Sequence, residues 1–126
     1  NKCKKKSINF IQLLSPTTSI LRMKKIIKDS HDMIYYISML STTGGKLKVL
    51  PKIILKKYRK IKKLSHFKNI VIGFGITDKT ISSFKKADGL VIGSQLCRTI
   101  TKSINGRHNT VKILNKMVYN LKRKII

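Results

Sequence analysis

Short apolar runs alternate with amphipathic segments along the chain. The apolar runs are residues 7–14, 33–39, 69–73 and 90–92, and polar or glycine-rich residues follow each of them. Such runs are typical of buried strands. The intervening segments have the apolar spacing of helices, as with Ile54, Tyr58 and Ile61 between lysines. The predicted helices are residues 20–28, 51–64, 77–86, 95–101 and 110–125.

Strand and helix therefore alternate four times. The predicted strands are wholly apolar rather than alternately apolar and polar, which indicates a parallel sheet covered by helices. This α/β pattern leaves two architectures open, a doubly wound sheet or a piece of a (β/α)8 barrel. The 126 residues are enough for one domain with its own core.

Glycine or hydroxyl residues follow three of the predicted strands, as Thr43-Gly44, Gly73-Phe74-Gly75 and Gly93-Ser94. The carboxyl ends of parallel strands meet at one edge, where ligands of α/β proteins bind. Backbone N–H groups at such turns, together with the Ser94 hydroxyl, suit a phosphate. The alternative is that the glycines serve only the bends. Thr77 is predicted to cap the next helix, with Asp78 complementing its dipole.

Candidate acid–base residues are few. The chain has no glutamate, and Asp29, Asp32 and Asp88 precede strands, at the edge opposite the glycine loops. No general acid–base pair is visible. His31, His66 and His108 have no partner at metal-ligand spacing, so no metal site is predicted.

Tyr35 and Tyr36 are neighbours within a predicted strand, so their side chains are expected on opposite faces of the sheet. One tyrosine should face the helices and the other the opposite side. From the pattern alone, a core role is favoured over a ligand contact for either.

The formal net charge of +25 raises the possibility of nucleic-acid binding. However, the lysines are spread over the outer faces of helices, which favours compositional drift over a dedicated interface. Cys3 and Cys97 belong to no metal or redox motif, so we expect reduced thiols. No run approaches the roughly 18 apolar residues of a membrane span, and the cytoplasm is the expected location.

Five motifs occur together in order: Leu14-Ser15-Pro16-Thr17-Thr18, Ile34-Tyr35-Tyr36-Ile37-Ser38, Thr43-Gly44, Gly73-Phe74-Gly75-Ile76 and Asp88-Gly89-Leu90-Val91-Ile92-Gly93-Ser94. From about Ser7 to its end, the chain resembles the tryptophan synthase alpha chain family. The resemblance implies that residues 1–126 form one domain, the carboxyl-terminal half (strands 5–8) of a (β/α)8 TIM barrel of about 250 residues.

The resemblance further implies a lyase that cleaves indole-3-glycerol phosphate to indole and glyceraldehyde 3-phosphate in tryptophan biosynthesis. Its substrate phosphate site corresponds to Gly44, Gly75, Gly93 and Ser94. Tyr35 corresponds to a residue of the indole pocket, and Thr43 to the loop that closes over the substrate. The family's catalytic carboxylates correspond to nothing in this chain. No cofactor is implied here; pyridoxal phosphate is expected in a partner, the tryptophan synthase beta chain.

Two positions depart from the family pattern. Ser41 stands where glycine is usual, and Gln95 stands where a small residue is usual. Four strands of an eight-stranded barrel also leave two open edges, and residues such as Ile37 and Val71 without a facing layer. The chain alone is therefore expected to fold poorly or to pair with a second half. A non-catalytic split or decayed remnant is the alternative function.

Overall fold

A parallel four-stranded sheet is the centre of the fold. This computed structural model describes residues 2–38, 50–65 and 67–126. The strands are β1 (Gln12–Leu14), β2 (Met33–Ile37), β3 (Asn69–Gly73) and β4 (Gly89–Val91), and they lie in the order β1-β2-β3-β4. All three pairings are parallel, as the apolar runs predict.

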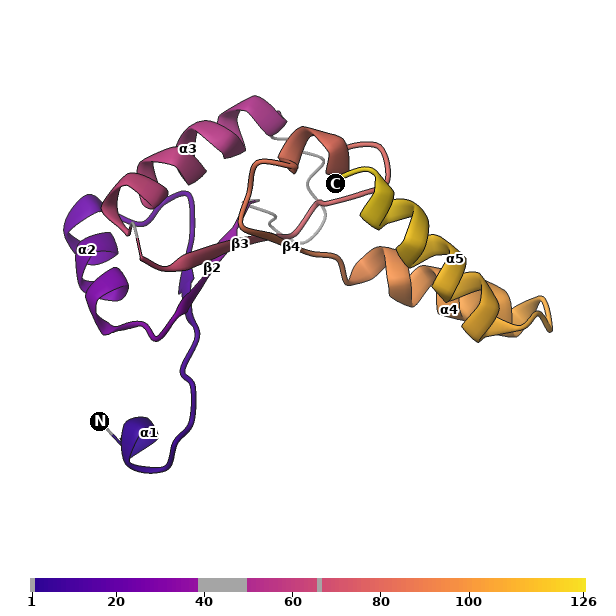
Figure 1. The fold of residues 1–126 in the computed structure, drawn as a ribbon, viewed down its shortest axis with the longest axis horizontal. Helices are drawn as coiled ribbons and strands as arrows, with labels where there is room; N and C mark the ends of the chain where they lie inside the picture. Colours follow the sequence, from indigo (N-terminus) through magenta and orange to yellow (C-terminus); the bar gives the residue numbers. More distant parts are fainter. Residues whose placement is uncertain (1, 39–49, 66) are drawn as a thin grey trace.

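Helical segments follow each strand as expected, but α1, ahead of β1, was not predicted. They are α1 (Lys2–Lys5), α2 (Ile20–Asp29), α3 (Pro51–Leu64), the 3-10 helix η1 (Ile81–Phe84), α4 (Ser94–Asn105) and α5 (Thr110–Arg123). Figure 1 shows α2 and α3 on the same side of the sheet, whereas α4 and α5 pack together beyond β4. The strand order has no reversal of the kind a doubly wound sheet shows, so the barrel alternative is the correct one.

The face of the sheet toward α2 and α3 forms the core. Ile34, Tyr36 and Ile72 on this face are each at most 1% exposed. Ile54, Tyr58 and Ile61 of α3 are buried in the same core, as their helical spacing predicts. Burial raises the pKa of Tyr36 to about 12. This layer of apolar packing supplies the main stabilisation of the chain.

The other face of the sheet is open. Leu13, Tyr35 and Val71 lie side by side on it through the strand register. Leu13 is 57% exposed, and Tyr35, Ile37 and Val71 are only half-buried. Among the described residues, Ile37 and Val71 are thus only partly covered, in line with the prediction that they lack a facing layer. In β1, β2 and β3, apolar side chains that point toward α2 and α3 are therefore buried, whereas those that point to the other face are only partly buried.

The first strand is shorter than predicted. We expected residues 7–14, but β1 begins at Gln12. Gln12 pairs with Ile34, the second residue of β2, so residues 7–10 extend past the start of the neighbouring strand. A strand requires backbone hydrogen bonds to a neighbouring strand, and an apolar composition cannot replace them.

The helix expected over residues 77–86 is also wrong in extent, since only η1 forms there. The Thr80 hydroxyl accepts a hydrogen bond of 3.0 Å from the backbone N–H of Thr77. Thr77 consequently does not cap a helix. Threonine hydroxyls that bond the local backbone favour turns over helices.

Two helices bury only part of their apolar surface. In α2, Met23 and Ile27 are buried, whereas Leu21 is 82% exposed. In α5, Leu121 is buried, whereas Val111 is 68% and Val118 is 49% exposed. The reason is that α5 packs chiefly against α4 and not against the sheet.

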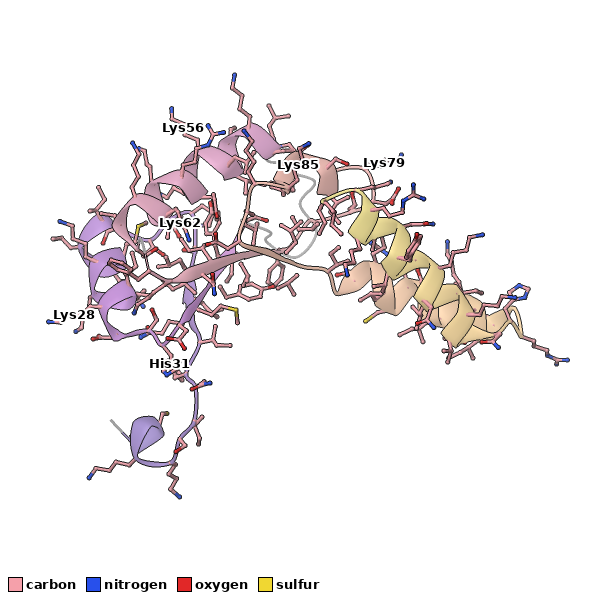
Figure 2. The ribbon with its side chains drawn as sticks, in the orientation of Figure 1. Lys28, His31, Lys56, Lys62, Lys79 and Lys85 are labelled. Carbon is pink, nitrogen blue, oxygen red and sulfur yellow. The ribbon has the colours of Figure 1, made fainter. Side chains whose placement is uncertain are left out.

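Lysines lie on the outer faces of the helices. Lys28 of α2 and Lys56 of α3 are exposed and point away from the sheet (Figure 2). This distribution agrees with lysine as a general surface residue. Among the described residues, no helix is long and apolar enough to cross a membrane.

Candidate functional site

One pocket opens at the carboxyl ends of β2, β3 and β4, with a volume of about 280 Å³. Its lining consists of Tyr35, Phe74, Gly75, Ile76, Thr77, Val91, Gly93, Ser94 and Arg98. Four residues singled out from the sequence, Tyr35, Gly75, Gly93 and Ser94, therefore meet in one place. The predicted Thr43 and Gly44 lie outside the described residues, so their positions relative to the pocket stay a prediction.

The turn after β3 forms the first wall. Phe74 and Gly75 both have positive φ angles, of 66° and 72°. Two consecutive left-handed residues turn the chain sharply, and the second of them is glycine because side chains disfavour this conformation. The buried Ser38 hydroxyl lies within hydrogen-bonding distance of the carbonyl oxygens of Gly73 and Phe74. Ser38 thus holds the turn from the end of β2.

The start of α4 forms the second wall. Gly93 is its N-cap and Ser94 its first residue. A Cβ atom added at Gly93 would have no heavy atom within 4 Å, so the space above this backbone is open. Free N–H groups at a helix N-terminus attract anions, and the Ser94 hydroxyl adds another donor. The wall therefore suits a phosphate or carboxylate group.

Tyr35 forms the third wall. Its ring meets Phe74 edge to face, with 6.3 Å between ring centroids and 83° between planes. A Cβ atom on Gly73 would lie 1.9 Å from the Tyr35 hydroxyl, so the missing side chain of Gly73 makes room for the tyrosine. The aromatic pair gives the pocket an apolar part beside the donors of Gly75 and Ser94.

A polar link joins two of the walls. The Gln95 side-chain oxygen accepts a 3.0 Å hydrogen bond from the backbone N–H of Asp78. The Asp78 carboxylate in turn lies 2.7 Å from the Lys124 ammonium, just beyond α5. Asp78 therefore does not start a helix as expected; it connects the β3 loop to the chain after α5. The unusual Gln95 connects the same loop to α4.

Asp88 lies at the opposite, amino-terminal edge, as predicted. Its carboxylate is 2.7 Å from Lys62 Nζ and accepts a 2.8 Å hydrogen bond from the backbone N–H of Ile70. Burial raises the pKa of Asp88, but the bonds from Lys62 and Ile70 outweigh it, so the pKa lies below its ordinary value. The pairing of β3 with β4 begins at Val71 and Gly89, so Ile70 has no partner residue in β4. The Asp88 carboxylate accepts the hydrogen bond of the Ile70 N–H instead. Asp88 is a structural residue.

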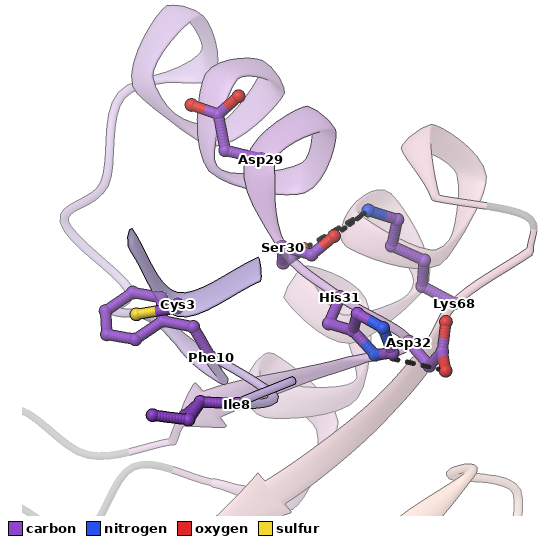
Figure 3. Close-up of a pocket in the computed structure, with 8 residues that line it drawn as sticks. All are labelled: Cys3, Ile8, Phe10, Asp29, Ser30, His31, Asp32 and Lys68. Carbon is purple, nitrogen blue, oxygen red and sulfur yellow. Dashed lines mark hydrogen bonds and ion pairs between the residues drawn. The ribbon is translucent and has the colours of Figure 1, made fainter. Parts of the chain in front are cut away.

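A second hollow opens near this edge, between the α1 region and the start of β2 (Figure 3). Lys68 there donates hydrogen bonds to the carbonyl oxygens of Ile27 and Ser30, which end α2. A lysine at a helix C-terminus is stabilising. His31 Nδ1 and Asp32 Oδ2 form an exposed pair 3.1 Å apart. Within the described ranges, no cluster of three His, Cys, Asp or Glu side chains could hold a metal.

The sequence interpretation missed Arg98, which lines the carboxyl-edge pocket, and Ser38, which bonds the turn that forms its first wall. Arg98 follows Ser94 by four residues, which on a helix places both on one face. That spacing is visible in the sequence once the helix is known to start at Ser94. Ser38 gave no such signal, because its partners Gly73 and Phe74 are 35 and 36 residues away.

Comparison with known proteins gives a consistent result. The family model described as tryptophan synthase alpha chain matches residues 1–126. The tryptophan synthase alpha chain of Pelagibacter ubique is 68% identical over 124 residues, covering 98% of this chain and 47% of that protein. The one from Aquifex aeolicus is 36% identical over 118 residues, covering 90% and 44%. The chain spans about half the length of the curated relatives it matches.

Solved structures agree with the sequences. A tryptophan synthase alpha chain from Legionella pneumophila superposes with a TM-score of 0.79 at 25% identity, covering 97% of this chain and 44% of that one. A structure described for the tryptophan synthase a2b2 complex of Pyrococcus furiosus gives a TM-score of 0.74 at 27% identity, covering 94% and 47%. The described fold thus corresponds to half of a (β/α)8 barrel.

Proposed function

Since the chain belongs to the tryptophan synthase alpha chain family, we propose that it is the phosphate-holding half of a lyase acting on indole-3-glycerol phosphate. The reaction is a retro-aldol cleavage that yields indole and glyceraldehyde 3-phosphate. The observation that carries the proposal is the convergence of Tyr35, Gly75, Gly93 and Ser94 on one pocket.

In this proposal the residues of the chain bind and orient the substrate. Backbone N–H groups at Gly75 and at the start of α4, with the Ser94 hydroxyl, hold the phosphate. The Tyr35 ring contacts the indole. Gly44 belongs to the phosphate site and Thr43 to the closing loop, as the resemblance implies. Anchoring both ends of the substrate places its reacting bond at a fixed position, which is itself a large part of catalysis.

The acid–base chemistry must come from residues outside this chain. Two of the described carboxylates are already engaged: Asp88 with Lys62 at the amino edge, and Asp78 with Lys124 near the pocket. In the family pattern the catalytic glutamate and aspartate lie in the other half of the barrel. The active site in this proposal therefore forms only when both halves of the barrel are present.

The proposal includes the family's partner. We infer that the complete alpha chain associates with a tryptophan synthase beta chain, whose pyridoxal phosphate joins indole to serine. The solved complex from Pyrococcus furiosus supports this inference by analogy. A cytoplasmic location belongs to the same proposal, as for a biosynthetic enzyme. Membership of this family gives no support to the nucleic-acid alternative, despite the charge.

The test uses a joined protein: the part of the Pelagibacter ubique relative that this chain does not cover, fused ahead of Asn1. We expect this protein to release indole from indole-3-glycerol phosphate. Gly75→Val should abolish the activity, because the side chain occupies the place of the phosphate oxygens. Ser94→Ala should weaken substrate binding about tenfold by removing one donor to a charged group.

Gly106→Val is the matched control, since Gly106 lies in the turn between α4 and α5 and lines no part of the pocket. Circular dichroism of every variant establishes that it is folded. Binding of sn-glycerol 3-phosphate without indole release would identify a non-catalytic remnant. Unchanged affinity for that ligand in Gly75→Val would refute the placement of the site.

A further inference from the structure

Arg98 lines the carboxyl-edge pocket together with Gly75, Gly93 and Ser94. It lies one turn after Ser94 in α4, and residues four apart on a helix share a face. Throughout the described part of the chain, no hydrogen bond or ion pair engages its guanidinium. A long cation beside an anion-binding turn is therefore available to a ligand.

The other groups around the pocket do not neutralise the negative charge of a bound phosphate. A phosphate monoester carries between one and two negative charges near neutral pH, with a second pKa of about 6. The donors at Gly75, Gly93 and Ser94 are neutral, and among the described residues of the lining the titratable side chains are Tyr35 and Arg98. The nearby Asp78 carboxylate and Lys124 ammonium neutralise each other at 2.7 Å. Arg98 is the remaining cation among these groups.

We propose that Arg98 binds the substrate phosphate and makes the site selective for its dianion. The guanidinium presents two parallel N–H donors to phosphate oxygens, a geometry that backbone N–H groups cannot offer. This inference rests on the proposed function and extends it. The neutral donors fix where the phosphate lies, while Arg98 determines which charge state binds more tightly.

The experiment measures the affinity of the joined protein for sn-glycerol 3-phosphate by calorimetry. Arg98→Gln should weaken binding roughly tenfold, as expected for loss of a charge-assisted pair in an open site. Lys102→Gln is the matched control, because it removes the same charge one turn further along α4. Its affinity should stay within about twofold of the unmodified protein. Arg98→Lys should recover part of the loss.

A pH profile separates a direct contact from a structural role. In the unmodified protein, affinity should rise between about pH 5 and 7.5 as the ligand becomes a dianion. This rise should shrink in Arg98→Gln and persist in Lys102→Gln. A variant that merely loosened α4 would lose affinity equally at every pH.

The possible results are distinct. If the unmodified protein and Arg98→Gln bind the ligand with equal affinity, the role of Arg98 is refuted. The proposed function is not affected by that result. An equal loss in Lys102→Gln overturns it too, since the effect would then be general attraction. Failure of the unmodified protein to bind the ligand refutes the proposed function and this inference together.

Discussion

Two neighbouring tyrosines, Tyr35 and Tyr36, lie on opposite faces of the sheet and have different surroundings. Tyr36 points to the helix-covered face of the sheet and is 1% exposed. Tyr35 points to the open face, is half-buried and lines the pocket. The two residues share their chemistry and their strand. What separates them is the two-residue period of the strand, which assigns each to a different layer.

The two faces also differ in how complete they are. The covered face has a finished core, including Leu14, Ile34 and Ile70 at 0% exposure. The open face carries Val91 at 39% exposure and the half-buried Ile37 and Val71. Half of a barrel thus retains one of its two cores, the one between sheet and helices. The other core requires the remaining strands, and so does the proposed active site.

The largest expected effect comes from completing the open face. Burial of apolar surface stabilises by roughly 25 cal/mol for each Å², so the joined protein should be more stable than the isolated chain by several kcal/mol. Urea unfolding followed by circular dichroism measures the difference. We expect a broad transition for the isolated chain and a sharp one for the joined protein. A sharp, cooperative transition in a monomeric isolated chain would contradict the distinction between the faces.

Substituting the tyrosines tests the comparison directly. Tyr36→Ala should lower the free energy of unfolding of the joined protein by about 3–5 kcal/mol, because it leaves a cavity in the covered core. Tyr35→Ala should cost less stability but weaken substrate binding. Urea titration and indole release separate the two results. If both variants lost stability equally, the two faces would not differ as described.

Asp88→Ala extends the comparison to the amino-terminal edge. It should lower the free energy of unfolding by about 2 kcal/mol, since Lys62 and the Ile70 N–H lose their partner. Ligand affinity should not change. Asp32→Ala is the matched control, because the Asp32 side chain is 87% exposed, and its effect should stay under about 0.5 kcal/mol.

The Asp88 carboxylate also makes the stability of the chain depend on pH. The pKa of Asp88 is lower in the folded chain than its ordinary value. Its contribution to stability is therefore complete above the unfolded pKa of about 4 and is lost as the pH falls through the folded pKa. Between neutral pH and the acid range, Asp88→Asn should lose less stability than the unmodified protein.

Ser38→Ala should have the smallest effect on stability, about 1–2 kcal/mol, through the loss of one hydrogen bond to the turn after β3. Ser38 lies at the end of β2 and holds Phe74, which lines the pocket. The variant should therefore also weaken sn-glycerol 3-phosphate binding a few-fold. Calorimetry measures this change. An unaltered affinity would show that the turn keeps its shape without Ser38.

Much of the site was predictable because it consists of local backbone chemistry. The parallel strands follow from apolar runs, and the carboxyl-edge location follows from the topology. Gly75, Gly93 and Ser94 stand out because they follow two strands at the edge where ligands of α/β proteins bind. Asp78 was misassigned for the opposite reason: its partner Lys124 is 46 residues away, and local spacing pointed to the first turn of a helix.

By itself, the sequence determined the order of strands and helices, the glycine-rich edge and the separation of Tyr35 from Tyr36 onto opposite faces. These depend on contacts within a few residues or on the period of an element. The tertiary structure decided which tyrosine faces the pocket, that Ser38 holds the turn after β3, and that Arg98 reaches the same pocket as Gly75. Those relations join strands far apart in the chain, and only packing specifies them.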